Sequence, residues 1–144
     1  MRAAVLYRIG AAVLVLFAVL HTIGFMNFKP PTAEGLAVRD AMANVRFEVK
    51  GTSFSYGSFY QGFGLFVTAY LLFSAFLAWH LATRPAPAIG WGLCVAQIAC
   101  MALGAIYFST VQASFCAVVA GLLGWATWRS QRDVGRPSLA AACL

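Results

Sequence analysis

The sequence predicts an all-α protein, a membrane-spanning four-helix antiparallel bundle with a short external helical or extended segment between its first two spans. Of the 144 residues, 62% are hydrophobic and 10% are charged, whereas about a quarter of the residues of a soluble domain are charged. Four apolar runs approach the roughly 20 residues that a helix needs to cross a bilayer. Because backbone polar groups need partners within lipid, these runs are expected to be helices. We therefore expect one transmembrane domain over residues 1–144.

The four spans are expected at about residues 9–28, 59–81, 88–108 and 111–128. The first span follows Arg2 and Arg8, as the apolar part of a signal peptide would, but no small-residue cleavage site follows it, which indicates a retained anchor. The short links at 82–88 and 109–110 predict that the last three spans are antiparallel neighbours. Residues 29–58 then form an external segment, and residues 129–144 form a cytoplasmic tail.

The external segment contains signals for both a helix and an extended stretch. Pro30 and Pro31 interrupt the chain, Thr32 can cap a helix, and apolar residues follow at helical spacing from Val38. Residues 45–50 alternate strictly between apolar and charged side chains up to Gly51, which is typical of a strand. The sequence leaves open whether one or both of these elements form, or whether the segment is a solvated linker.

The charges at the span ends predict the orientation, because cytoplasmic loops carry an excess of Lys and Arg. Six arginines fall on one side and four cations on the other, namely Arg2, Arg8, Arg84, Arg129, Arg132 and Arg136 against Lys29, Arg39, Arg46 and Lys50. All four tryptophans, Trp79, Trp91, Trp125 and Trp128, fall at the level of the first group, as in an interfacial belt. Both termini are therefore expected in the cytoplasm.

Residues 51–65, where the chain enters the membrane again, mix hydroxyl groups, aromatic rings and four glycines. Ser55 or Ser58 can cap the second span, while Gly62 and Gly64 permit another backbone or a ligand to come close. One interpretation is a capped helix start with an aromatic interface belt. The other is the lip of a pocket, in which Gly62 is expected to be the more sensitive glycine because Tyr60 and Gln61 are near it.

Polar side chains gather at the predicted outer level of the bundle, where they are costly unless they find partners. This convergence predicts either an internal hydrogen-bond network or a polar patch at the head of a hydrophobic cavity. The candidate ligand-binding residues are His21, Thr22, Asn27, Tyr56, Tyr60, Gln61 and Tyr107.

His21 is the ionisable residue placed well inside a span. It is either a structural histidine bonded to Tyr60, Gln61 or a carbonyl group, or an acid–base group of a small membrane enzyme with Tyr60 as hydrogen-bond donor. A haem held by two histidines is excluded within one chain, because His21 is at the outer level and His80 at the inner level. Zinc hydrolysis lacks a second ligand and a general base, so no metal and no cofactor is expected.

The cysteines and the positive charge fit this membrane interpretation. Cys94, Cys100, Cys116 and Cys143 show no paired metal-ligand spacing and are expected to be inert core thiols. The net charge of +6 comes from Lys and Arg at segment ends and in one loop, not from a stripe. A nucleic-acid partner is therefore not expected.

Three segments resemble a family of small, uncharacterised bacterial four-helix membrane proteins: His-Thr-Ile-Gly-Phe at 21–25, Gly-Thr-Ser-Phe-Ser-Tyr at 51–56 and Phe-Tyr-Gln-Gly-Phe-Gly-Leu at 59–65. The resemblance covers nearly the whole chain and implies a multi-pass protein of the bacterial inner membrane, without an assigned activity. The layout is also similar to small membrane-bound glutathione transferases and sterol-isomerase-like proteins. Their motifs are missing, because the spans carry neither an Arg/Glu-rich helix nor acidic residues.

Three functions follow as hypotheses. The first is a non-catalytic module that binds membrane lipid or a small hydrophobic ligand in the outer half of the bundle. The second is the small enzyme that uses His21 and Tyr60. The third is an accessory subunit of a larger membrane complex, which docks through the external segment, and small residues on the first and third spans also permit a homo-oligomer.

Overall fold

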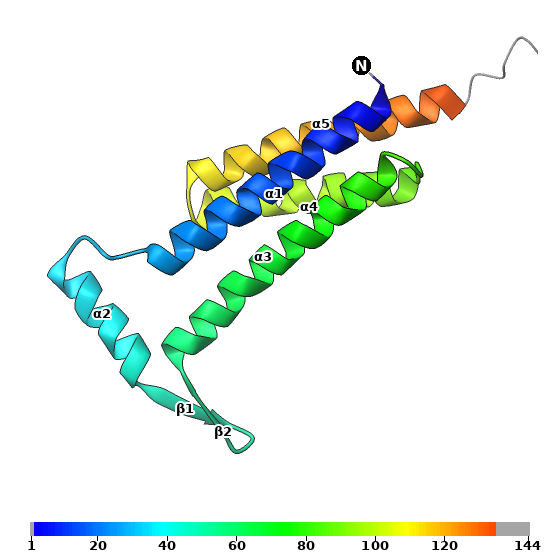
Figure 1. Cartoon of the computed structure of the whole chain (residues 1–144). Helices are drawn as coiled ribbons and strands as arrows, with labels where there is room; N and C mark the ends of the chain where they lie inside the picture. Colours follow the sequence, from blue (N-terminus) through cyan, green and yellow to red (C-terminus); the bar gives the residue numbers. More distant parts are fainter. Residues whose placement is uncertain (1, 135–144) are drawn as a thin grey trace, which may run out of the picture. The chain divides into compact units, whose positions relative to one another are not determined.

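The computed structural model describes residues 2–134 as five helices and a two-stranded hairpin (Figure 1). In chain order the elements are α1 (Ala3–Asn27), α2 (Ala33–Asn44), β1 (Arg46–Val49), β2 (Thr52–Ser55), α3 (Tyr56–Leu81), α4 (Pro87–Tyr107) and α5 (Thr110–Val134). Of the described helices, α1, α3, α4 and α5 are long and apolar enough to span a membrane. The prediction of an all-α bundle with four spans is confirmed.

The described chain divides into two compact units, and α1 and α3 each contribute to both. The bundle unit contains the chain up to Phe17 and from Leu72 onward, and therefore includes α4 and α5. The hairpin unit is Ala18–Leu71 and contains the second half of α1, α2, β1, β2 and the first half of α3.

The core of the bundle unit is aliphatic and lies between α1, α3, α4 and α5. Leu14, Leu81, Val119 and Leu123 are almost completely buried there. Tyr7 of α1 bonds Thr127 of α5, and Phe17, further along α1, stacks on Phe115, which comes earlier in α5. The ring centroids of Phe17 and Phe115 are 4.9 Å apart. The two helices are therefore antiparallel, as are α4 and α5, which are joined by a turn at residues 108–109.

Three of the four cysteines lie in the described residues and are free thiols, with Cys94 and Cys116 buried. The thiol of Cys94 donates a hydrogen bond to the carbonyl of Ala120 across 3.4 Å. The buried positions of Cys94 and Cys116 agree with the expected core thiols, whereas Cys100 is partly buried and Cys143 lies outside the described residues.

The helices differ from the predicted spans mainly at their ends. Helix α1 begins six residues before the predicted position 9, and α5 continues to Val134 instead of ending at 128. Both extensions carry arginines, which lower the hydropathy without interrupting a helix. Hydropathy therefore located the apolar part of each helix but not its charged ends.

Residues 29–58 form both of the elements that their sequence allowed. Thr32 caps α2, because its hydroxyl accepts a hydrogen bond from the backbone N–H of Gly35 at 3.1 Å. Helix α2 has no buried residue. The alternating stretch forms β1, which pairs antiparallel with β2 and places Phe47 opposite Phe54. The turn between them contains Lys50 and Gly51, both with positive φ (49° and 81°), which is the conformation that a two-residue hairpin turn requires.

Helix α3 starts with a reciprocal pair of serine caps. The backbone N–H of Ser58 donates to Ser55 Oγ at 3.0 Å, and the backbone N–H of Ser55 donates to Ser58 Oγ at 3.1 Å. Both predicted capping residues are therefore used, in the arrangement of a capping box. Helix α3 starts directly after β2, at Tyr56.

Candidate functional site

His21 lies half-buried in the hairpin unit and joins α1 to α3. Its Nε2 lies 3.2 Å from the carbonyl oxygen of Gly64. Because a carbonyl oxygen can only accept, Nε2 must carry the proton and donate it. Of the partners expected for a structural histidine, namely Tyr60, Gln61 or a carbonyl group, the structure shows a carbonyl group, that of Gly64.

Thr22, next to His21, provides a second polar link between the same two helices. Its hydroxyl donates to the carbonyl of Ala18 at 2.7 Å, and its Oγ1 lies 2.8 Å from Thr68 Oγ1. Thr68 in turn donates to the carbonyl oxygen of Gly64 at 3.3 Å, so the two hydroxyls and two backbone carbonyls form one polar network. These bonds satisfy polar groups that would be costly in an apolar setting.

The two helices come close together at Gly64, where the ring of Phe25 packs over the helix backbone. A Cβ atom built on Gly64 would lie 2.6 Å from Phe25 Cε2 and 2.7 Å from Cε1, distances that real Cβ atoms do not adopt. The missing side chain of Gly64 thus makes room for Phe25. The predicted close approach exists, and it occurs at Gly64.

The expectation that Gly62 is the more sensitive glycine does not agree with this geometry. Among the described residues, no atom outside its local backbone lies within 4 Å of a Cβ built on Gly62. A helix turns by about 100° per residue, so Gly62 lies about 200° from Tyr60, on another face. Gly64, four residues after Tyr60, returns to the face of Tyr60.

Aromatic rings continue from His21 toward the exposed surface. His21 stacks on Phe25, with ring centroids 5.9 Å apart, and Phe25 is tilted against Tyr60 at 5.7 Å. Tyr60 is 55% exposed. We call His21, Phe25 and Tyr60 the aromatic row. It runs from a half-buried ring, fixed by a backbone bond, to a phenol ring at the surface.

The remaining predicted site residues take other positions. Asn27 donates to the carbonyl of Ile23 in its own helix at 2.8 Å, and Gln61 is exposed. Tyr56 contacts Phe47 of β1, with ring centroids 4.8 Å apart. Tyr107 belongs to the bundle unit, where it is 72% exposed at the end of α4. The structure therefore joins His21, Thr22 and Tyr60 through their neighbours, and does not gather Asn27, Tyr56 and Gln61 of the same unit into this set of contacts.

Sequence reasoning missed Phe25 and Thr68 as parts of this arrangement. A signal was present, because Tyr60, Gly64 and Thr68 follow one another at intervals of four residues and so share one helix face. His21 and Phe25 have the same spacing on α1. Pairing these two faces would have predicted the observed contacts.

A second polar contact that the sequence analysis did not single out lies in the bundle unit. The hydroxyl of Tyr7, a completely buried residue of α1, bonds Thr127 Oγ1 of α5 at 3.0 Å. Gly90 of α4 faces the same two side chains, and a Cβ built on it would lie 2.8 Å from the Tyr7 hydroxyl. A glycine is therefore required at this crossing.

The aromatic row is held together by ring contacts and by the bond of His21 to the backbone of Gly64. In the described part of the chain, no three His, Cys, Asp or Glu residues are close enough to hold a metal ion. The ring contacts that lead from His21 to Tyr60 pass through the ring of Phe25. No family model matches this sequence, and no curated protein or solved structure matches it.

Proposed function

We propose that this polytopic membrane protein is a non-catalytic module that binds a lipid or another small hydrophobic molecule at the aromatic row of the hairpin unit. The observation that supports the proposal is the row itself, in which three rings lead from the His21–Gly64 bond to the half-exposed Tyr60. Stacked rings present an apolar wall, and the phenol hydroxyl adds a polar group at its end.

The wall is held in place before any ligand arrives. His21 is fixed by its bond to Gly64, and Phe25 fits the space above that glycine. Thr22, next to His21, and Thr68, one turn after Gly64, add a further link between the same helices. A surface fixed in this way loses little conformational freedom when it binds a ligand.

Polar and apolar groups meet at the surface end of the row. Tyr60 and Gln61 are both exposed, and their side chains offer a hydroxyl and an amide. Phe59 and Phe63, also exposed, stack edge to face at 4.9 Å beside them on α3. This combination suits a molecule with an apolar body and one polar group, such as a lipid.

The enzyme hypothesis has less support. A general acid–base pair needs donor and acceptor within about 3 Å, directly or through one water molecule. His21 instead uses Nε2 in a backbone bond, and Phe25 stands between its ring and that of Tyr60 in the chain of contacts. We therefore assign His21 a positioning role in the proposed site.

The accessory-subunit hypothesis has one observation in its favour. Helix α2 lacks any buried residue, although it carries apolar side chains such as Val38, which is 60% exposed. A protein partner would cover such a helix. We keep this function as the second candidate, to be separated from the first by the same experiment.

The test is native mass spectrometry of the full chain after extraction in a mild detergent. We expect a small hydrophobic molecule to be retained by the unmodified protein. Tyr60→Phe should retain clearly less of it at an unchanged melting temperature, because this change keeps the ring and removes only the hydroxyl. Phe66→Leu, at an exposed apolar position on the same helix, serves as the matched control and should retain the molecule fully.

Each alternative outcome has a defined meaning. If the extracted protein carries no small molecule, or if Tyr60→Phe retains it as well as the unmodified chain does, binding at the aromatic row is refuted. If a protein partner is retained at fixed stoichiometry instead, and truncation of α2 releases it, the accessory-subunit function replaces the present proposal.

A further inference from the structure

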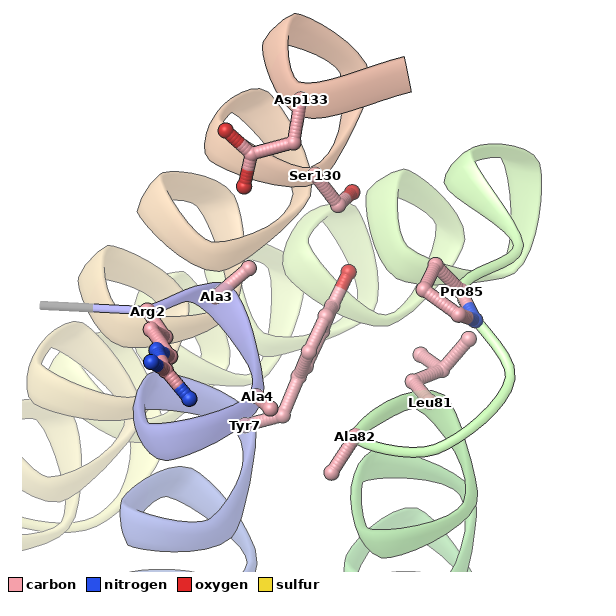
Figure 2. A pocket seen from close by; sticks show the side chains of 9 residues that line it. All are labelled: Arg2, Ala3, Ala4, Tyr7, Leu81, Ala82, Pro85, Ser130 and Asp133. Atoms are coloured by element: carbon pink, nitrogen blue, oxygen red, sulfur yellow. The ribbon is translucent and has the colours of Figure 1, made fainter. Parts of the chain in front are cut away.

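A cavity of about 380 Å³, open on one side, lies at one end of the bundle unit (Figure 2). Its walls come from the start of α1, the link between α3 and α4, and the last turns of α5. The volume is in the usual range of about 300–1,000 Å³ for sites that bind small molecules. None of the residues that line the cavity belongs to the aromatic row, which is part of the hairpin unit.

The cavity lies at the level of the bundle unit where cationic and tryptophan side chains meet. The guanidinium of Arg8 lies 5.6 Å from the ring of Trp79, and that of Arg132 lies 3.8 Å from the ring of Trp128. Trp91 also donates to Gln131 at 3.4 Å. Tryptophan and arginine mark the boundary between lipid tails and head groups, so we expect the cavity at the depth of a phospholipid head group.

The buried polar atoms of the cavity are acceptors. Thr127 donates its hydroxyl proton to the carbonyl of Leu123 at 2.7 Å, so Tyr7 must donate in the bond that joins the two hydroxyls. Ser130, 3% exposed, donates its own proton to the carbonyl of Thr127 at 2.7 Å. Because the Tyr7 side chain is completely buried, Ser130 is the one of these two residues that offers lone pairs to a molecule in the cavity.

Among the described residues that line the cavity, one side chain is cationic and one is anionic. Arg2 stands at the start of α1 and Asp133 in the last turn of α5, and both line the cavity without forming an ion pair with each other in the described structure (Figure 2). The start of a helix favours an anion and its end favours a cation. The start of α1 and the side chain of Arg2 thus both favour an anion, and the end of α5 and the side chain of Asp133 both favour a cation.

Apolar residues complete the walls. Leu81, Ala82 and Pro85 come from the end of α3 and the link to α4, and Figure 2 shows them across the cavity from the start of α1. A ligand must therefore combine a cation able to donate several hydrogen bonds, an anion beside it, and an apolar remainder. A phospholipid with a primary ammonium head group has these three parts.

We propose that this cavity binds the head group of an aminophospholipid, with its ammonium group at Asp133 and Ser130 and its phosphate at Arg2. The ammonium donates N–H bonds to the carboxylate of Asp133 and to the hydroxyl oxygen of Ser130, whose own proton is already used in its bond to Thr127. The phosphate pairs with the guanidinium at the positive start of α1. A head group without N–H donors, or without a cation, leaves the acceptors unpaired.

The chemistry distinguishes this ligand from the other common phospholipids. Phosphatidylcholine has the same net charge as phosphatidylethanolamine, but its quaternary ammonium carries no N–H. Phosphatidylglycerol has the phosphate and no cation, and Asp133 would repel its charge. A site that relied on the surrounding arginines alone would prefer phosphatidylglycerol, as basic pockets between membrane helices prefer anionic head groups.

The test is lipid competition, followed by native mass spectrometry on the full chain in mild detergent. Phosphatidylethanolamine, its N-monomethyl and N,N-dimethyl forms, phosphatidylcholine and phosphatidylglycerol are supplied with identical acyl chains. We expect phosphatidylethanolamine to be retained about tenfold better than phosphatidylcholine, with a stepwise decline as N–H groups are replaced. This series needs no variant, so it does not depend on the folding of any mutant.

Variants then locate the site. Asp133 is exposed on the last turn of α5, so Asp133→Asn should fold normally while it loses the preference for phosphatidylethanolamine over phosphatidylcholine. Arg2→Gln should weaken both lipids. The matched control is Asp40→Asn, an exposed acid on α2 in the other unit, and it should leave the preference unchanged.

Equal retention of the lipids by the unmodified chain, a preference for phosphatidylglycerol, or an unchanged preference in Asp133→Asn would each overturn the proposal. None of these outcomes bears on the aromatic row, which is tested by Tyr60→Phe in a separate unit.

Discussion

Gly64 sets the separation of α1 and α3 in the hairpin unit, because Phe25 occupies the space that a side chain would need. The same glycine offers its carbonyl oxygen to His21. One residue therefore provides both a gap and a hydrogen-bond acceptor. The hydrogen bond of His21 and the close packing of Phe25 therefore depend on the same residue.

We expect Gly64→Ala to lower the stability of the protein by about 1–3 kcal/mol, the usual cost of overpacking. The new methyl group would displace Phe25, which is in contact with His21 on one side and Tyr60 on the other. Thermal unfolding in detergent, followed by circular dichroism, measures the effect.

Gly62→Ala is the matched control two residues away, where a methyl group meets open space. It should be neutral or stabilising, since Ala is the better helix former by about 1 kcal/mol. Phe25→Leu combined with Gly64→Ala should recover part of the loss. If Gly62→Ala costs more than Gly64→Ala, the packing of Phe25 does not explain the glycine.

Residue positions were predictable only in part, for a geometric reason. The polar character of His21 and Thr22 pointed to partners on the next helix, and both found them. The partners themselves depend on how α1 and α3 are rotated against each other, which composition does not reveal. Proximity in sequence directed attention to Gly62, whereas the helical period of 3.6 places Gly64 on the contact face.

At the scale of elements, the start of α3 illustrates how a strand is converted directly into a helix. Strand β2 ends at Ser55, and α3 starts at the following residue, Tyr56. The reciprocal bonds of Ser55 and Ser58 satisfy N–H groups that the first turn of a helix leaves unpaired. The hairpin is thereby connected to a membrane-spanning helix without a loop.

Ser55→Ala should destabilise the protein by about 1 kcal/mol, because it removes an N-cap acceptor. Ser58→Ala should have a similar effect, and the double variant should lose less than the two single losses together, since both changes break the same box. Thermal unfolding in detergent measures all three.

Thr52→Ala on strand β2 is the control, because the Thr52 hydroxyl takes part in no hydrogen bond within the described residues. It should change the melting temperature little. Fully additive losses for Ser55→Ala and Ser58→Ala would mean that the two caps act separately.

The elements were more predictable than the contacts, with one omission. Long apolar runs identified the four long helices, and Thr32 and the alternation after Val45 identified α2 and β1. Strand β2 was missed because its four residues merge with the capping sequence of α3. The signal was the Lys50–Gly51 pair, whose positive φ angles suit a two-residue hairpin turn.

At the scale of the whole molecule, the distribution of charge carries the information about orientation. In the bundle unit, contacts of Arg8 with Trp79 and of Arg132 with Trp128 link the arginines to the tryptophans. The bond from Trp91 to Gln131 adds the start of α4 to this end. Three of the tryptophans that the sequence places at one level thus contact polar or cationic side chains within this unit. The side of the membrane on which they lie is a prediction from the charges.

We expect this arginine-rich end to face the cytoplasm, because positive charge is retained there during insertion. A reporter fused to the C-terminus should be active only in a form that works in the cytoplasm. One inserted after Ala43, in a helix without buried residues, should be active only in a form that works outside. A third, inserted in the link after Arg84, is the internal control and should behave like the C-terminal fusion. The opposite pattern would place the Arg2 and Asp133 cavity in the outer leaflet, and the aminophospholipid that it selects would then have to come from that side.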